Sequence, residues 1–183
     1  PDLVVLTDQE ELILALPNGH HLCRFSGSST QSAQKAAQRI LRHTRINPLI
    51  ELSYPHQKFN VSVALTGAYQ QGMVVQGDEL GFAVRTNRQA WLFLIDIAPS
   101  GEIHVLYPFE PKDLRPLPAN ERIVLPHTGQ VVPPYGTETL KLFAFTNRPQ
   151  DLDMLVGQTS IQPESRLYAV IEDMLGLWKN TSG

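Results

Sequence analysis

Residues 77–108 read GDELGFAVRTNRQAWLFLIDIAPSGEIHVLYP, and this stretch decides the fold. It contains three apolar runs of strand length, at residues 79–86, 90–97 and 103–107, separated by two short turn sequences. Short loops between strands usually join neighbours in one sheet. We therefore expect the three runs to form an antiparallel meander.

The middle run has the pattern of a strand at the centre of the fold. Its odd-numbered residues, from Trp91 to Ile97, would point to one face of the strand, and Leu92 and Leu94 to the other. Both sets are apolar, so both faces should be covered by other parts of the protein. This strand should supply a large share of the core.

The N-terminal part predicts a hairpin followed by a helix. Residues 11–16 and 20–25 are apolar runs on either side of Pro17-Asn18-Gly19, a turn sequence because Asn and Gly accept positive φ. Residues 29–43 carry apolar side chains at the spacing of one helix face. Asn47-Pro48 should end this helix, because the residue before a proline is pushed out of the helical region.

The remaining sequence predicts further strands and one more helix. The strands are expected at residues 60–65, 70–76, 122–125 and 140–146. Proline-rich sequence at 108–118 and 131–136 cannot donate to a sheet ladder and should form loops or edges. An apolar face recurs at helical spacing from Leu167 to Trp178, with Pro163 suited to the first turn, so we expect a helix docked on the sheet.

These patterns predict a mainly β fold of the α+β class. The arrangement expected is an antiparallel β-sandwich or open barrel, with an N-terminal hairpin–helix unit and a C-terminal packed helix. Residues 1–50 would be an appendage to a β domain of residues 51–183, unless the two parts form one compact unit.

Composition excludes several classes of function. The 183 residues carry a net charge of −3, which gives no general attraction to nucleic acid. No apolar run is long enough to cross a membrane and the chain does not start with a signal sequence, so we expect no membrane insertion and a cytoplasmic location. Because the sequence begins at Pro1 and not at an initiator Met, we expect a piece of a longer protein.

Cys23 is the only cysteine, so neither a disulfide nor a zinc site built from thiolates is expected. On a strand, His21 and Cys23 would share one face. This Cys–His pair is the strongest candidate for a catalytic site if the chain is an enzyme of an unfamiliar kind. The simpler interpretation is a buried thiol beside surface histidines. No metal and no cofactor is predicted.

Three other polar features also have simple structural interpretations. His104 would be a packed or surface residue of its strand. Asp96 could pair with Glu102 across the turn, but an Asp at a strand end more often shapes the turn that follows it. The basic residues between Arg39 and Arg45 would form the solvated face of the first helix.

Several short motifs occur in a characteristic order. They are Gly77-Asp78-Glu79-Leu80, Trp91-Leu92-Phe93-Leu94-Ile95-Asp96, Ser100-Gly101-Glu102-Ile103, Leu106-Tyr107-Pro108 and Pro133-Pro134-Tyr135-Gly136. Over residues 77–147 this order resembles the bacterial domain of unknown function family 4384. The resemblance implies a C-terminal module of the kind attached to caspase-like peptidases or, in other architectures, to kinases or envelope proteins. It implies no catalytic residues, because the His-Gly and Asp-x-Cys-x-Gly motifs of those peptidases are absent and Cys23 lies in His-Leu-Cys-Arg-Phe.

We therefore expect a non-catalytic accessory domain that recognises a protein partner or regulates a covalently linked catalytic domain. Its contact surface would include Phe109, Pro133, Pro134 and Tyr135, because loops and strand edges commonly carry recognition groups. The alternative is a carbohydrate-binding or cell-envelope-binding module, in which aromatic rings would stack on the ligand. The rings considered for that role are Trp91, Tyr107, Phe109 and Tyr135.

Overall fold

The computed structural model describes residues 4–8, 11–15, 21–26, 29–53, 60–67, 75–126, 129–130 and 138–177. Within these residues strands predominate over helices, and every strand pair is antiparallel. The prediction of a mainly β fold of the α+β class is therefore confirmed.

The described strands form three sheets. The strands are β1 (Val4–Asp8), β2 (Glu11–Ala15), β3 (His21–Ser26), β4 (Val61–Gly67), β5 (Glu79–Thr86), β6 (Trp91–Ile97), β7 (Ile103–Tyr107), β8 (Arg122–Val124), β9 (Gly129–Gln130) and β10 (Thr139–Phe145). The helices are α1 (Ser29–Glu51) and α2 (Arg166–Leu175), with short 3-10 helices η1 (Pro111–Asp113) and η2 (Leu152–Leu155).

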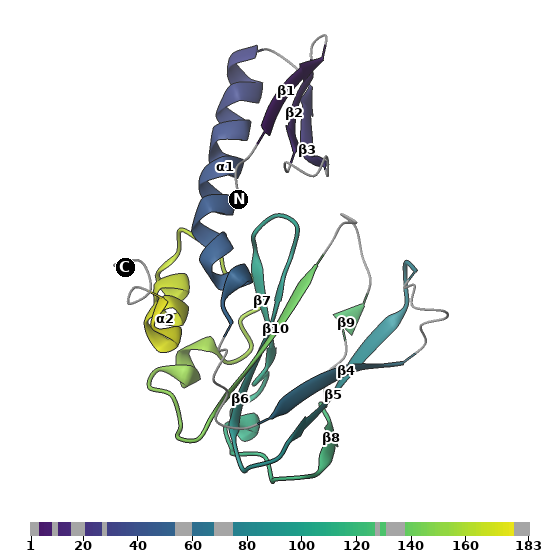
Figure 1. The fold of residues 1–183 in the computed structure, drawn as a ribbon, viewed down its shortest axis with the longest axis vertical. Helices are drawn as coiled ribbons and strands as arrows, with labels where there is room; N and C mark the ends of the chain where they lie inside the picture. Colours follow the sequence, from purple (N-terminus) through teal and green to yellow (C-terminus); the bar gives the residue numbers. More distant parts are fainter. Residues whose placement is uncertain are drawn as a thin grey trace.

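Two of the sheets pack face to face as an open sandwich (Figure 1). One has the order β10-β6-β7, and in the other β5 lies between β4 and β8 and also pairs with β9. The predicted meander is wrong, because β5 and β6 belong to different sheets and only β6 and β7 form a hairpin. Stacking the sheets brings the apolar faces of β5 and β6 together, which removes more apolar surface from water than edge-to-edge pairing would.

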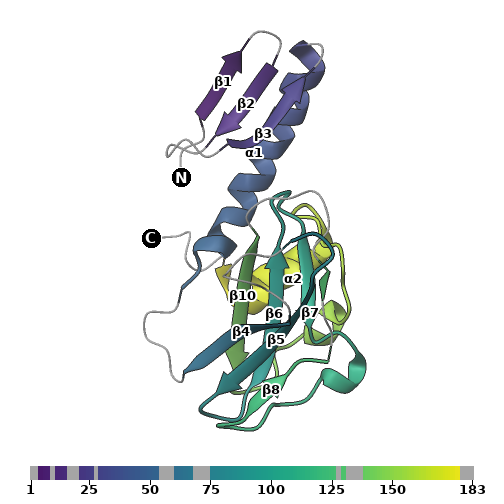
Figure 2. The same ribbon diagram turned by 90° about the vertical axis from the view of Figure 1, so that its right-hand side faces the viewer.

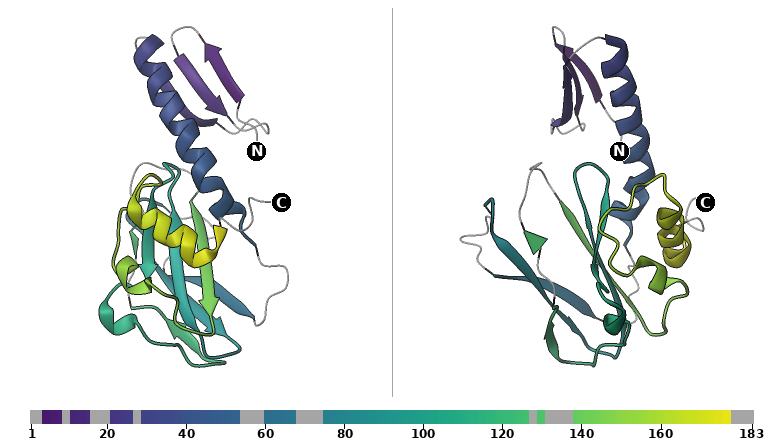
Figure 3. Two further views of the ribbon diagram at one scale, coloured as in Figure 1. Left: turned by 90° about the vertical axis from the view of Figure 1, so that its left-hand side faces the viewer. Right: turned by 180° about the vertical axis from the view of Figure 1, so that it is seen from behind.

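Strand β6 is the centre of the fold, as predicted, and its two faces lie in two different cores. Phe93, Ile95 and Ile97 are buried against the helices α1, α2 and η2. Leu92 and Leu94 are buried against the sheet that contains β5. The main body therefore has three layers, with the β10-β6-β7 sheet between the second sheet and the helices (Figure 3).

Helix α1 is longer than predicted, because it runs through Pro48 to Glu51. The expectation that Asn47-Pro48 ends it is wrong. Ile46 and Leu49, on either side of this pair, are 1% and 0% exposed in the core shared with β6. A proline inside a helix costs about 3 kcal/mol, whereas full burial of an isoleucine or a leucine stabilises by about 1.5–3 kcal/mol each. The burial of Ile46 and Leu49 in the last turns of α1 therefore outweighs the preference of Asn47-Pro48 to end the helix.

The N-terminal sheet has the order β1-β2-β3, and α1 lies against it (Figure 2). The predicted hairpin is confirmed by the antiparallel pairing of β2 with β3, while its turn, Pro17-Asn18-Gly19, lies outside the described residues. Ser32 and Ala36 are buried one helical turn apart on α1. The same helix thus packs on this small sheet with its first half and on the main core with its second.

Helix α2 docks on the outer face of the β10-β6-β7 sheet, as predicted (Figure 3). Tyr168 and Ile171 are completely buried there. The helix begins at Arg166, and the hydroxyl of Ser165 accepts a hydrogen bond of 3.3 Å from the Tyr168 N–H. Pro163 therefore precedes the helix instead of lying in its first turn. Trp178 lies outside the described residues.

The remaining strand predictions fare differently along the chain. Strands at 60–65, 122–125 and 140–146 are confirmed as β4, β8 and β10, with bounds that agree to within two residues. Most of the strand predicted at 70–76, and the whole proline-rich segment 131–136, lie outside the described residues.

Shortening Leu49 to Ala should destabilise the whole β domain. Leu49 is completely buried among β6 and α2 residues, so we expect a loss of about 2–5 kcal/mol in the free energy of unfolding. Leu41→Ala is the matched control, because this leucine of the same helix is 69% exposed and should change stability by less than about 0.5 kcal/mol. Urea unfolding followed by tryptophan fluorescence measures both. Equal effects would show that the end of α1 does not belong to the core.

Candidate functional site

Of the four residues predicted to contact a partner, the structure describes Phe109. It follows β7 and is partly buried, and its N–H donates a hydrogen bond of 3.1 Å to the Asp113 carboxylate. Pro133, Pro134 and Tyr135 lie outside the described residues. The predicted contact surface therefore stays a prediction.

Of the aromatic rings considered for sugar stacking, Tyr107 lies in the interior and Trp91 is partly buried. Tyr107 is 3% exposed, and its hydroxyl donates a hydrogen bond of 2.9 Å to the backbone oxygen of Asp113. Burial raises the pKa of Tyr107 to about 12. Trp91 packs against the core, with the Arg148 guanidinium 5.7 Å from its ring centroid. The Tyr107 ring is therefore not accessible for stacking on a sugar.

A group of ionisable side chains lies where β6, β7 and β10 approach the β6–β7 turn. We call Asp96, His104 and Glu138 the Asp96 cluster. Asp96 and His104 are directly opposite each other on neighbouring strands, and Asp96 Oδ2 lies 3.4 Å from His104 Nδ1. The Asp96 side chain is 10% exposed, and its other oxygen is buried without a hydrogen-bond partner.

Electrostatics couple the members of the Asp96 cluster. The hydrogen bond that His104 donates to the Asp96 carboxylate raises the pKa of His104, and the negative charges of Asp96, Glu102 and Glu138 add to this effect. Burial raises the pKa of Glu138, and the charge of Asp96 raises it further. When it is protonated, His104 places a positive charge beside the buried Asp96 carboxylate, which lowers the cost of burying that charge.

The interpretation of Asp96 as a residue that shapes the turn is wrong. Its carboxylate faces His104, while the turn is closed by backbone bonds and by the Ser100 hydroxyl, which accepts from the Glu102 N–H at 3.3 Å. The Asp96–His104 pair could have been found from the sequence, because these two residues are equally far from the centre of the Pro99-Ser100-Gly101 turn. Glu138 could not, because it comes from a distant segment.

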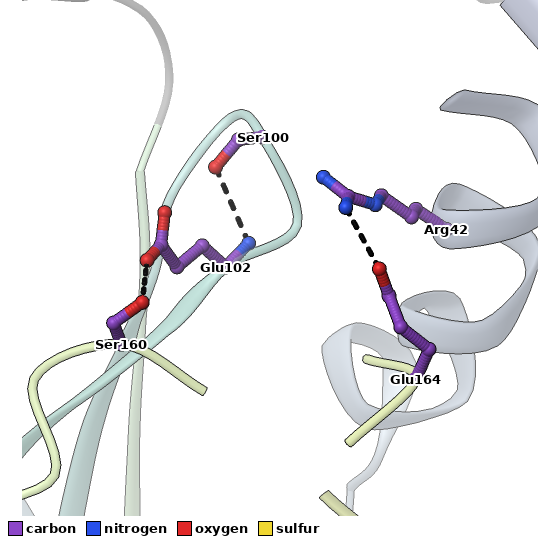
Figure 4. Close-up of polar contacts among 5 residues, drawn as sticks. All are labelled: Arg42, Ser100, Glu102, Ser160 and Glu164. Atoms are coloured by element: carbon purple, nitrogen blue, oxygen red, sulfur yellow. Dashed lines mark hydrogen bonds and ion pairs between the residues drawn. The ribbon is translucent and has the colours of Figure 1, made fainter. Parts of the chain in front are cut away.

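The basic residues of α1 contact the main body instead of forming only a solvated face. Arg42 makes an ion pair of 2.7 Å with Glu164 (Figure 4). Arg39 donates a hydrogen bond to the backbone oxygen of Pro99 in the β6–β7 turn. Beside it, the Ser160 hydroxyl donates to Glu102 and ties the same turn to the segment before α2 (Figure 4).

Arg45 connects α1 to α2 in three ways. Its guanidinium lies 5.2 Å from the ring centroid of Tyr168 and 3.5 Å from the Glu172 carboxylate. Its backbone oxygen accepts a hydrogen bond of 2.7 Å from the Tyr168 hydroxyl. Burial raises the pKa of Tyr168, which keeps this hydroxyl a donor at neutral pH. These contacts fix α1 relative to the helices and turns of the main body.

His21 and Cys23 both lie in β3, opposite Ala15 and Leu14 of β2. Their side chains lie outside what the structure describes, so the enzyme interpretation of this pair is untested. Within the described ranges, no three His, Cys, Asp or Glu side chains are grouped in a way that could hold a metal ion. No helix in this part of the chain has the length and hydrophobicity to cross a bilayer.

Three consecutive exposed apolar residues lie in the N-terminal sheet. In the described part of the chain β1 pairs with β2, and no described strand pairs with its second edge. Val4, Val5 and Leu6 are 37%, 49% and 44% exposed. An open strand edge with apolar side chains can pair with another extended chain.

The fold defines the centre of the chain as an antiparallel β-sandwich module covered by helices on one face. Residues 74–148, which include β5 to β10, match the family described as a domain of unknown function (DUF4384). The family predicted for residues 77–147 is thereby confirmed. No curated protein and no solved structure matches the chain.

The stability of the chain should depend on the charge of His104. Since its folded-state pKa is raised, the stabilisation is complete below the unfolded pKa of 6.5 and is lost as pH rises through the folded pKa. The raised pKa of Glu138 likewise makes the folded state less stable as pH rises. His104 is 36% exposed, so solvent screening should limit its contribution to under about 1 kcal/mol.

Urea unfolding at several pH values tests this dependence. His104→Gln should reduce the loss of folding stability that the native chain shows above pH 6.5, the ordinary pKa of histidine. His43→Gln should not, because burial lowers the pKa of His43. NMR titration should place the His104 pKa above its ordinary value and lower it in Asp96→Asn. An unshifted His104 would contradict the pairing.

The hydrogen bond between Tyr168 and Arg45 should contribute more to the free energy of unfolding than the exposed ion pair between Arg42 and Glu164. Tyr168→Phe removes a buried hydroxyl from its acceptor, so we expect a loss of about 1 kcal/mol in the free energy of unfolding. Arg42→Gln breaks a pair whose side chains are 38% and 56% exposed, and its effect should be smaller, about 0–1 kcal/mol. The reverse order in urea unfolding would contradict the proposed roles.

Proposed function

We propose that this chain is a non-catalytic, cytoplasmic accessory domain through which a larger protein recognises a protein partner or a catalytic domain in the same polypeptide. A caspase-like peptidase is the linked domain that we propose, because the order of motifs in residues 77–147 resembles the modules attached to such enzymes. The observation that carries the proposal is the open, apolar edge of β1.

The geometry around α1 supports the proposal that this helix holds the edge of β1 in place for a partner. The N-terminal sheet lies on the first half of α1, away from the sandwich (Figure 1). The second half of α1 is held by the buried Ile46 and Leu49 and by contacts of Arg42 and Arg45. A strand edge on a rigid support loses little conformational entropy when a partner binds.

Site-specific cross-linking tests the proposal in the full-length protein within its own cells. A benzophenone side chain at position 5, on the open strand, should cross-link to polypeptide, either a second protein or another domain of the same chain. The same group in place of Leu41, which is 69% exposed on α1, is the control and should give fewer cross-linked species. Equal cross-linking at the two positions would contradict the proposal.

A further inference from the structure

Two arginines lie side by side on the outer face of the second sheet, and we call Arg85 and Arg122 the arginine pair. On β5 the side chains of Phe82 and Val84 are buried between the two sheets, so Arg85, the next residue, points to the outer face. Arg122 of β8 is directly opposite Arg85, and Ile123 after it packs inward. Both arginines are exposed, and the described helices pack on the other sheet (Figure 3).

Within the described residues no acidic side chain compensates the arginine pair. Neither guanidinium makes an ion pair there, although exposed Glu121 comes directly before Arg122 in the chain. Glu79, on the same face of β5, is about 20 Å from Arg85 along an extended strand. Directly opposite residues have Cα atoms about 4.5–5.5 Å apart, and like charges at such positions lower stability. The arginine pair is therefore unfavourable for folding, and a role in binding would explain it.

The charge of the arginine pair selects the kind of anion. A phosphate monoester carries a charge of about −1.5 to −2 at neutral pH and three acceptor oxygens, so it can accept hydrogen bonds from two guanidinium groups. One carboxylate brings a single charge, and two neighbouring carboxylates would repel each other. A single phosphoryl group is therefore the anion that best matches two adjacent arginines.

The surroundings of the arginine pair favour a protein as the carrier of this group. Ser62 of β4 is directly opposite Arg85, and Ala64 follows on the same face. Val124, two positions after Arg122, is 55% exposed. These neighbours offer a hydroxyl and apolar contacts to a protein segment but no further positive charge. Nucleic acid binding requires several basic groups along the phosphates, and the net charge of the chain is −3.

We propose that the arginine pair binds a phosphorylated side chain in an extended segment of a protein partner, with an apolar residue of that segment against Val124. This surface is separate from the edge of β1, so the inference does not rest on the proposed function. It adds a contact that depends on phosphorylation of the partner.

Two peptides that differ in one side chain test this on the native chain. One is acetyl-GVGSGVG-amide with its serine phosphorylated, and the other has Glu in place of the phosphoserine. In NMR titrations at low salt the phosphopeptide should shift the backbone amides of β5 and β8 and the Nε–H signals of Arg85 and Arg122. It should bind at least about fivefold more tightly than the Glu peptide. Equal affinities, or no shift at millimolar phosphopeptide, would overturn the inference.

Three variants then locate the binding surface. Arg85→Gln and Arg122→Gln should each weaken phosphopeptide binding at least about tenfold. Neither should lower the temperature of thermal unfolding, because each also relieves the repulsion between like charges. Lys35→Gln is the control, since Lys35 is an exposed cation in the first half of α1, and it should bind like the native chain. Unchanged binding by Arg85→Gln, or equal weakening by Lys35→Gln, would overturn the assignment to the arginine pair.

Two further probes identify the occupant. Inorganic phosphate should bind at least about threefold more weakly than the phosphopeptide, because it makes no apolar contact with Val124. Equal binding of inorganic phosphate would identify a free anion as the occupant, and tighter binding of a thymidine oligonucleotide would identify a nucleic acid. Either result would overturn the inference. Neither bears on cross-linking from position 5, which tests the proposed function separately.

Discussion

Burial of β6 on both faces is the constraint on which the rest of the structure depends. Its alternating side chains are too apolar to leave either face in water, so one face requires a second sheet and the other requires helices. The second sheet is built around β5, which explains why the chain crosses between sheets after Thr86 instead of continuing as a meander. The three-layer body follows from this one strand.

The helical layer reaches beyond the sandwich. Because Ile46 and Leu49 complete the core beside β6, α1 continues through Pro48 and becomes long enough to carry a separate sheet at its other end. Arg42 and Arg45 then fix its direction through Glu164, Glu172 and Tyr168. The position of the exposed β1 edge is thus a consequence of packing on the opposite side of the molecule.

The Asp96 cluster lies where β6 changes from apolar to polar. Asp96 follows Leu92 and Leu94 on the sandwich face, so a carboxylate occupies a position where the pattern of the strand places an apolar residue. His104, directly opposite on β7, supplies a compensating charge when it is protonated. Sequence reasoning treated His104 as a packed or surface residue and Asp96 as a residue that shapes the turn, although their equal distance from the turn centre indicates that they pair. Glu138 joins them only through the pairing of β10 with β6, which the sequence does not reveal.

The sequence by itself determined the strands β5, β6 and β7, the hairpin of β2 and β3, the docked α2 and the family of residues 74–148. These depend on local periodicity, turn residues and short motifs, which short segments carry unaided. Only the tertiary structure decided which strands share a sheet, that α1 passes through Pro48, and that its arginines bind the main body. The reason is that sheet partners and ion pairs join residues far apart in the chain, and that burial in a shared core outweighs the local preference of a single residue.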